Sequence, residues 1–215
     1  MAFIPPYGVT YSALAECAEK LGIDCHTLTP QELVDENVFT AARFPVAIYT
    51  GVENYYRTVQ QPGDGEQALL RYLHEGGMLQ VAGVCHPFTY PIDVQADGTE
   101  KQIPDWILFN KQFELFLLGP GEKTGDAIGF ETPPEGVTLT MNLNPSQPVL
   151  WDFPQTLPFP TQGDRRYRPQ TAEGIAPGDQ FMPFLTTKGS DGRDYGPAAA
   201  LIQHNCAAFK GAQVL

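Results

Sequence analysis

The sequence predicts an α/β fold: a three-layer sandwich whose mostly parallel sheet carries helices on both faces, followed by a β-rich and loop-rich C-terminal elaboration. Apolar strand patterns alternate with amphipathic helix patterns, joined by short connections, over residues 1–87. Parallel strands need such crossover helices, so the alternation favours a parallel sheet. The alternation then stops, and a loop-like segment rich in proline, glutamine, aspartate and glycine occupies residues 144–180.

Local signals place the elements of the first part. Strands are expected at four apolar runs: Phe3–Ile4, Ile23–Leu28, Val46–Tyr49 and Met78–Val84. Helices are expected over Leu14–Leu21, just after Thr29, and over Asp64–Glu75. Gly22 follows the first of these helices and is a typical helix stop. Thr29 and Glu32 have the spacing of a capping box, which predicts where the second helix begins.

The part of the sequence after residue 87 predicts mainly strands. An Asp97–Gly98 turn predicts a hairpin between Ile92–Val94 and Glu100–Ile103. Further strands are expected at Val137–Leu143, Ala198–His204 and Ala212–Leu215. We therefore expect one domain with a parallel core (1–87), an insertion (88–180) and closing strands (181–215). Because an apolar strand pattern runs to the last residue, further domains of a larger protein are one expected partner.

A helix over Ile107–Leu118 is also predicted. Its aromatic residues recur at helical spacing: Trp106, Phe109, Phe113 and Phe116. Such a stripe is typical of a helix core, whereas an exposed stripe would indicate a homo-oligomer interface or a larger parent protein.

Composition excludes several classes of protein. Hydrophobic residues make up 42% of the 215 residues, which excludes a disordered chain. We expect no membrane span and no leader, because no apolar run approaches the roughly 20 residues that a membrane helix needs. The net charge of −12 disfavours nucleic acid as a partner. The four cysteines and four histidines show no metal-binding spacing, so neither a metal nor a cofactor is expected.

A ligand crevice is expected beyond the carboxyl ends of the strands. If the strands follow the flavodoxin-like order 2-1-3-4, the loops after the first, third and fourth strands meet there. Candidate ligand-binding residues of the loop after the third strand are Gly51, Asn54, Tyr55, Tyr56 and Arg57. Such a mixture of phenols, amide and cation suits a small polar ligand such as a carbohydrate. The alternative is an ordinary loop whose tyrosines pack on the core and whose arginine pairs with an acid.

A second candidate binding segment follows residue 164. Arg165, Arg166 and Arg168 gather there in an otherwise acidic chain. Arginine side chains hold carboxylates or phosphates with paired hydrogen bonds, so the segment could bind an anion or another subunit. The alternative is a set of internal salt bridges that fix the long loop.

The segment Gly83-Val84-Cys85-His86-Pro87 places a cysteine after a strand. Together with the Thr50-Gly51-Val52 loop and Gly76-Gly77, it resembles the class I glutamine amidotransferase-like superfamily, with its DJ-1/PfpI and ThuA-like members, over residues 1–90. The resemblance implies a flavodoxin-like three-layer sandwich and a backbone N–H near Gly51 that contributes to an oxyanion hole.

The chain also departs from the pattern of that superfamily. Pro87 replaces the last glycine of its G-x-C-x-G elbow, and the late His204-Asn205-Cys206 lacks the H-x-E pair. We therefore favour a domain without glutaminase activity that binds a small polar ligand or a partner domain. The alternative is a cysteine-dependent hydrolase or amidase, with Cys85 as nucleophile, His86 as base and Glu53 as orienting acid.

Overall fold

The chain divides into two compact units, each described here by itself. Unit 1 comprises Met1–Glu114, Pro177–Asp179 and Gln203–Leu215, and unit 2 comprises Leu115–Ala176 and Gln180–Ile202. The computed structural model describes residues 1–5, 11–50, 53–81, 87–104, 109–115, 132–144, 156–158, 167, 169, 171–206 and 208–214.

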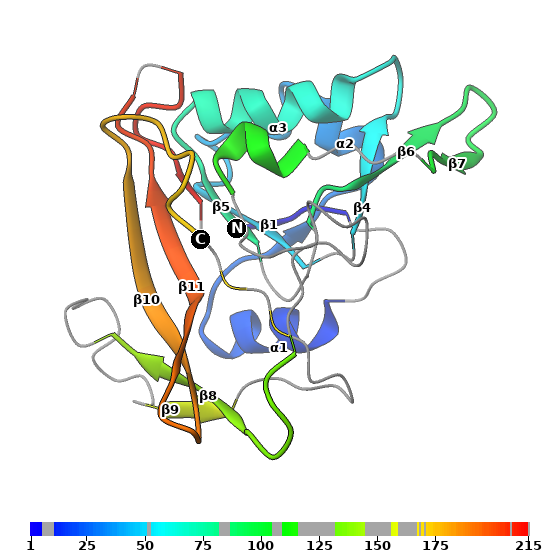
Figure 1. Cartoon of the computed structure of the whole chain (residues 1–215). Helices are drawn as coiled ribbons and strands as arrows, with labels where there is room; N and C mark the ends of the chain where they lie inside the picture. The colour runs from blue at the N-terminus through cyan, green and yellow to red at the C-terminus, as the bar shows by residue number, and fades with distance from the viewer. Residues whose placement is uncertain are drawn as a thin grey trace. The chain divides into compact units, whose positions relative to one another are not determined.

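Unit 1 contains five short parallel strands in the order β2-β1-β3-β5-β12, of which β1 and β5 are labelled in Figure 1. They are β1 (Ala2–Phe3), β2 (His26–Thr27), β3 (Val46–Tyr49), β5 (Met78–Val81) and β12 (Gln213–Val214). Met78 begins β5 and is in register with Val46 on one side and Gln213 on the other. The last described strand of the chain therefore lies beside β5.

Three α-helices occur among the described residues: α1 (Ser12–Lys20), α2 (Pro30–Val34) and α3 (Asp64–His74). The expected capping box is present at α2, where Thr29 Oγ1 accepts from the Glu32 N–H at 3.2 Å and Glu32 Oε2 accepts from the Thr29 N–H at 2.9 Å. Helix α1 is mostly exposed and buries Ala18, whereas Leu21 just beyond it is 75% exposed.

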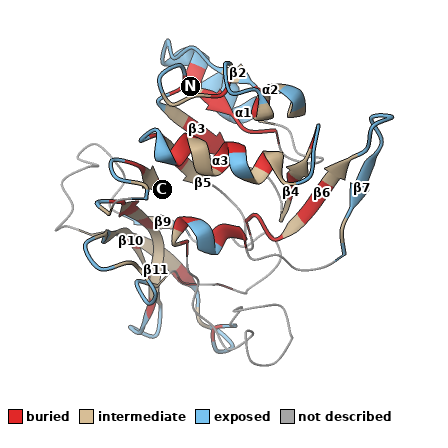
Figure 2. Ribbon diagram, turned by 90° about the horizontal axis from the view of Figure 1, so that it is seen from above, coloured by how far each residue is buried: buried red, intermediate tan, exposed pale blue. Residues whose placement is uncertain are grey.

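Helix α3 packs one face on the strands of unit 1. Its buried residues are Gly65, Ala68, Leu69, Tyr72 and Leu73, and they recur along the helix between half-buried and exposed positions (Figure 2). The Tyr72 hydroxyl lies 2.9 Å from the carbonyl oxygens of Phe44 and Met78, just before β3 and at the first residue of β5. This phenol therefore fixes the helix to the beginning of two strands.

A second, three-stranded sheet has the order β4-β6-β7. Its strands are β4 (Asn54–Thr58), β6 (Tyr90–Val94) and β7 (Glu100–Gln102). The hairpin of β6 and β7 confirms the expected pairing, with Gly98 at φ 84° in the turn. The strand β4 was not expected from the sequence.

The helix expected over Ile107–Leu118 is wrong in its described part. That part holds a 3₁₀ helix, Phe109–Phe113, and the chain then leaves it at Glu114 with φ 61°. Phe109 and Phe113 are buried and pack edge-to-face with Phe88, at 6.3 and 5.3 Å between ring centroids. These two aromatic residues therefore belong to the core of unit 1. Trp106 and Phe116 lie outside the described residues.

Unit 2 is antiparallel. Its strands are β8 (Leu139–Leu143), β9 (Thr156–Pro158), β10 (Gln180–Gly189) and β11, which runs from Asp194 to Gln203. Strand β8 pairs antiparallel with both β10 and β9. Leu139, Tyr167 and Tyr195 form a small core, against which Val137 packs.

The predicted flavodoxin-like three-layer sandwich is wrong. The described residues hold three α-helices and twelve strands, and the strands form one sheet of nine and one of three with both parallel and antiparallel pairs. The fold is therefore β-rich. Strands β10 and β11 are each ten residues long, and no helix lies between them to connect parallel strands as the predicted sandwich requires. No helix among the described residues is long and apolar enough to span a membrane.

Candidate functional site

The carboxyl ends of β1 and β3 provide the candidate site of unit 1. The chain leaves β1 toward β2 on one side and leaves β3 toward β5 on the other side. Where neighbouring parallel strands connect in opposite directions, their following loops separate and leave room for a ligand. The residues that follow β1 and β3 are therefore those from which a site would be built.

Two tyrosines and a threonine lie at this edge. The Tyr11 hydroxyl donates a hydrogen bond to the carbonyl of Ile4, and its ring stacks on Phe3 at 4.8 Å between centroids. Tyr49, the last residue of β3, is fully buried. The next residue is Thr50, whose Oγ1 is buried and has no hydrogen-bond partner among the described residues.

Electrostatics links these side chains. Burial raises the pKa of the Tyr11 phenol well above its ordinary value, and Tyr56 adds to the effect. Burial also raises the pKa of Tyr49, and the neighbouring Tyr11 and Glu53 reinforce this. Both phenols therefore stay protonated at neutral pH and serve as neutral hydrogen-bonding groups.

Glu53 joins two loops at this edge. Its carbonyl oxygen accepts hydrogen bonds from the N–H groups of Thr89 and Tyr90, at 2.9 and 3.0 Å. The segment after β3 is thereby attached to the segment that precedes β6. Phe88 lies in the latter with φ 55°, a left-handed conformation that costs energy for a side chain of this size, and its ring stacks on Tyr49 at 4.2 Å.

The residues Asn54–Arg57 lie on β4 rather than in the expected loop. The Tyr55 hydroxyl bonds to Glu66 Oε1 at 2.6 Å, and the Tyr56 hydroxyl bonds to Glu100 Oε1 at 2.7 Å. Both rings are buried. These hydroxyl groups already have partners within unit 1. Tyrosines packed in the core were the alternative to a ligand-binding role in the sequence analysis. Their predicted role in ligand binding stays a prediction.

Several predicted site residues lie outside the described residues: Gly51, Cys85, His86, Arg165, Arg166 and Arg168. Their roles as oxyanion donor, nucleophile, base and anion ligands stay predictions. The structure brings together Glu53 with Tyr11 and Tyr49, two residues that sequence reasoning missed. The signal that could have found Tyr49 is a tyrosine at the carboxyl end of an apolar strand.

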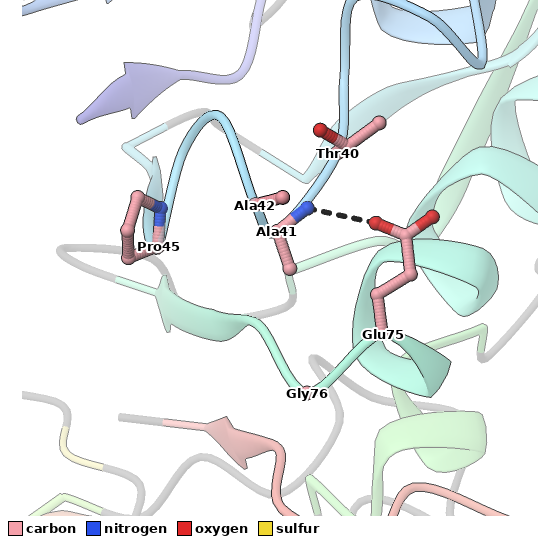
Figure 3. Close-up of a pocket in the computed structure, with 6 residues that line it drawn as sticks. All are labelled: Thr40, Ala41, Ala42, Pro45, Glu75 and Gly76. Atoms are coloured by element: carbon pink, nitrogen blue, oxygen red, sulfur yellow. Dashed lines mark hydrogen bonds between the residues drawn. The ribbon is translucent and has the colours of Figure 1, made fainter.

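A pocket of about 600 Å³ lies at the opposite, amino edge of the strands of unit 1 (Figure 3). Its lining residues are Thr40, Ala41, Ala42, Pro45, Glu75 and Gly76. The carboxylate of Glu75 already accepts a hydrogen bond from the Ala41 N–H at 2.8 Å, drawn dashed in the figure. Among the described residues, no histidine, arginine or lysine contributes to this lining, and we assign the pocket no ligand.

Side chains that could hold a metal ion gather at the same amino edge. They are Glu114, Asp179 and His204, whose ligand atoms all lie within 4.8 Å of one another. Sequence spacing gave no signal for this group, because its members are far apart in the chain.

No family model matches this chain, and no curated protein matches it. Its structure is similar to that of the cytoplasmic protein STM3548 from Salmonella typhimurium, with a TM-score of 0.53 and 12% sequence identity. The similarity covers 100% of this chain and 85% of that chain. At this identity it concerns the fold alone, so the resemblance to the amidotransferase-like superfamily stays a prediction.

Proposed function

We propose that unit 1 binds a small, neutral polyhydroxylated ligand, such as a carbohydrate, at the carboxyl edge of β1 and β3. The observation that carries the proposal is the buried Thr50 hydroxyl, which has no hydrogen-bond partner among the described residues. Buried hydroxyl groups are normally hydrogen-bonded, and the exceptions call for an explanation. A ligand hydroxyl would satisfy this one beside Tyr49.

Charge supports a neutral ligand. The segments that follow β1, β3 and β5 (residues 5–11, 50–53 and 82–87) contain no lysine and no arginine, and the chain has a net charge of −12. An anion would lack a lysine or arginine partner from these segments and would face the carboxylate of Glu53. Ligand hydroxyl groups can bond to phenols, hydroxyls and carboxylates without such a partner.

The test is a titration of the whole chain with neutral sugars and, in parallel, with the corresponding sugar phosphates, followed by calorimetry. We expect binding of a neutral sugar, and we expect the variant Thr50→Val to weaken it about tenfold, as the loss of one hydrogen bond of about 1.4 kcal/mol implies. The matched control is Thr27→Val, at the exposed end of the neighbouring β2. Preference for the phosphates, or equal affinity of wild type and Thr50→Val, would contradict the proposal.

A second candidate function is the cysteine-dependent hydrolase or amidase. The hydrogen bonds from Thr89 and Tyr90 to the Glu53 carbonyl support it, because they attach Glu53 to the segment that closely follows Cys85 and His86. The strained backbone of Phe88 is a second point in its favour, since such strain clusters at active sites.

Iodoacetamide labelling at a series of pH values tests this second candidate, with each cysteine followed by peptide mass spectrometry. Cys17 and Cys25 are exposed free thiols and serve as internal references. If Cys85 is an activated nucleophile, its labelling titrates well below the ordinary thiol value of about 8.5. Labelling of Cys85 that follows the references, or none in the folded protein, excludes this function.

A further inference from the structure

A turn near the end of the chain carries a buried histidine. The His204 N–H donates to the Ala212 carbonyl at 3.0 Å, and the Gly211 N–H donates back to the His204 carbonyl at 2.9 Å. Gln213 follows, begins β12 and pairs with Met78, the first residue of β5. His204 therefore lies at the amino edge of the parallel strands. The ligand site proposed above lies at the opposite, carboxyl edge.

Two carboxylates face this histidine. His204 Nδ1 lies 2.9 Å from Asp179 Oδ2 and 3.6 Å from Glu114 Oε2. The side chains of His204, Asp179 and Glu114 are only 1%, 2% and 15% exposed. A nitrogen and two carboxylate oxygens thus converge inside the protein.

Asp179 is held in place by the backbone. Its Oδ1 accepts from the N–H groups of Asn205 and Cys206, at 2.6 and 2.8 Å, which leaves Oδ2 directed at His204. Burial alone would raise the pKa of Asp179, but its hydrogen bonds with His204, Cys206 and Asn205 hold it well below the ordinary value. It is a buried carboxylate that forms no ion pair with lysine or arginine among the described residues.

A buried carboxylate needs a positive partner, because an isolated charge in the protein interior is very costly. Within the described residues the partner of Asp179 is His204, which carries charge only when protonated. His204 itself is not a fully bonded core histidine, since its Nε2 is buried without a hydrogen-bond partner among the described residues.

Cys206 adds a thiol next to the same carboxylate. Its Sγ donates to the Pro177 carbonyl at 3.0 Å. The hydrogen bond with Asp179 raises the pKa of Cys206, and burial and the charges of Asp179 and Glu114 raise it further. A soft sulfur atom therefore lies beside one of the two carboxylates, that of Asp179.

We propose that Glu114, Asp179 and His204 bind a divalent transition-metal ion of the zinc type, with Cys206 as the candidate fourth ligand. Zinc takes imidazole nitrogen, thiolate sulfur and carboxylate oxygen, whereas magnesium and calcium take oxygen ligands. Ligand bonds of about 2.0–2.2 Å in a tetrahedron separate neighbouring ligand atoms by about 3.3–3.6 Å. The two separations from His204 Nδ1, 2.9 and 3.6 Å, lie near this range, and all three ligand atoms lie within 4.8 Å of one another.

The ion would join the three chain segments that make up unit 1. Glu114 ends the first segment, Asp179 belongs to Pro177–Asp179, and His204 belongs to Gln203–Leu215. One metal ion would therefore tie these distant segments together, which is the role of a structural zinc site. This inference is independent of the proposed ligand function.

The test uses the full chain, stripped with a chelator and titrated with zinc by calorimetry, and then with cobalt(II) followed by absorption spectroscopy. We expect one equivalent of zinc, a rise in thermal stability on binding, and the visible bands of tetrahedral cobalt. A thiolate charge-transfer band that Cys206→Ser removes would identify the fourth ligand. The variants Glu114→Gln and His204→Gln should each weaken zinc binding at least tenfold. Even the loss of a residue that only hydrogen-bonds to a metal ligand commonly lowers metal affinity by that factor.

The chain offers a matched control in a second histidine–carboxylate pair. His26 Nε2 lies 3.1 Å from Glu32 Oε1, but this pair is part-exposed and is not among the metal-holding groups of the described residues. Glu32→Gln should therefore bind zinc as wild type does. Glu114→Gln keeps the proposal testable should His204→Gln not fold, because glutamine has nearly the size and shape of glutamate and removes only its charge. Absence of zinc binding in the wild type, or unchanged binding in Glu114→Gln, would overturn the proposal.

Discussion

The guanidinium of Arg57 on β4 forms two hydrogen bonds with the carboxylate of Asp93 on β6. Nε lies 3.0 Å from Oδ1, and Nη2 lies 2.7 Å from Oδ2. The side chains are 27% and 17% exposed. Paired geometry and partial burial distinguish this contact from an ordinary surface salt bridge, and it spans two strands of the three-stranded sheet.

We expect removal of either partner to destabilise the protein. Arg57→Ala and Asp93→Ala should each lower the free energy of unfolding by about 1–3 kcal/mol, and the double variant should cost less than the sum. Urea denaturation of the four proteins measures this coupling. The control pair is Arg71 and Glu75, one helical turn apart at 3.8 Å, whose coupling should be about 0.3–0.5 kcal/mol. Equal coupling in the two pairs would refute the distinction.

The same ion pair predicts an acid dependence of stability. The hydrogen bond from Arg57 lowers the pKa of Asp93 below its ordinary value. A carboxyl group with a lower pKa in the folded state contributes its stability above the unfolded value of about 3.9, and it loses that stability as the pH falls through the folded pKa. Thermal unfolding at a series of pH values should show this loss in wild type. The loss of stability at low pH should be smaller in Asp93→Asn. An equal loss in this variant and in wild type would show that Asp93 does not cause it.

Gly65 allows α3 to approach β4. A methyl group at this position would collide with the carbonyl oxygen of Tyr56. Gly65→Ala should therefore destabilise the protein by about 1–3 kcal/mol, although alanine normally favours a helix. Gln67→Ala, two residues further along the helix, is the control and should be near neutral. Chemical denaturation compares them, and a stabilised Gly65→Ala would show that the helix can shift without cost.

Elements fixed by neighbours in sequence could be predicted, and elements fixed by distant residues could not. Thr29 with Glu32, and Asp97 with Gly98, are local signals, and the structure has a helix and a hairpin turn at those places. Strand β4 was missed because Asn54–Arg57 is polar along its length. The ring of Tyr55 packs on Phe88 and Phe109, which come from far along the chain, and α3 also contacts this strand.

The candidate sites show the same division. Glu53 was singled out from its place after a strand, and its role as an orienting acid stays a prediction. The group of Glu114, Asp179 and His204 was not expected, because 65 and 25 positions separate its members and no motif links them. Only the folding of three separate segments into unit 1 brings these ligand atoms together. The fold class was wrong for a related reason, since strand pairing in the second half is long-range.

Removal of the Tyr72 hydroxyl should lower the stability of the protein, whereas removal of the Thr50 hydroxyl should not. The Tyr72 hydroxyl bonds to backbone carbonyls, so Tyr72→Phe should cost about 1–2 kcal/mol by leaving buried acceptors without a donor. The Thr50 hydroxyl has no partner among the described residues, so Thr50→Val replaces an unsatisfied polar group by a methyl group of similar size. Its stability should therefore equal or exceed that of wild type. Urea denaturation without added ligand measures both. A gain in stability combined with weaker sugar binding would show that the Thr50 hydroxyl serves the ligand rather than the fold, whereas a loss as large as that of Tyr72→Phe would show that it serves the fold.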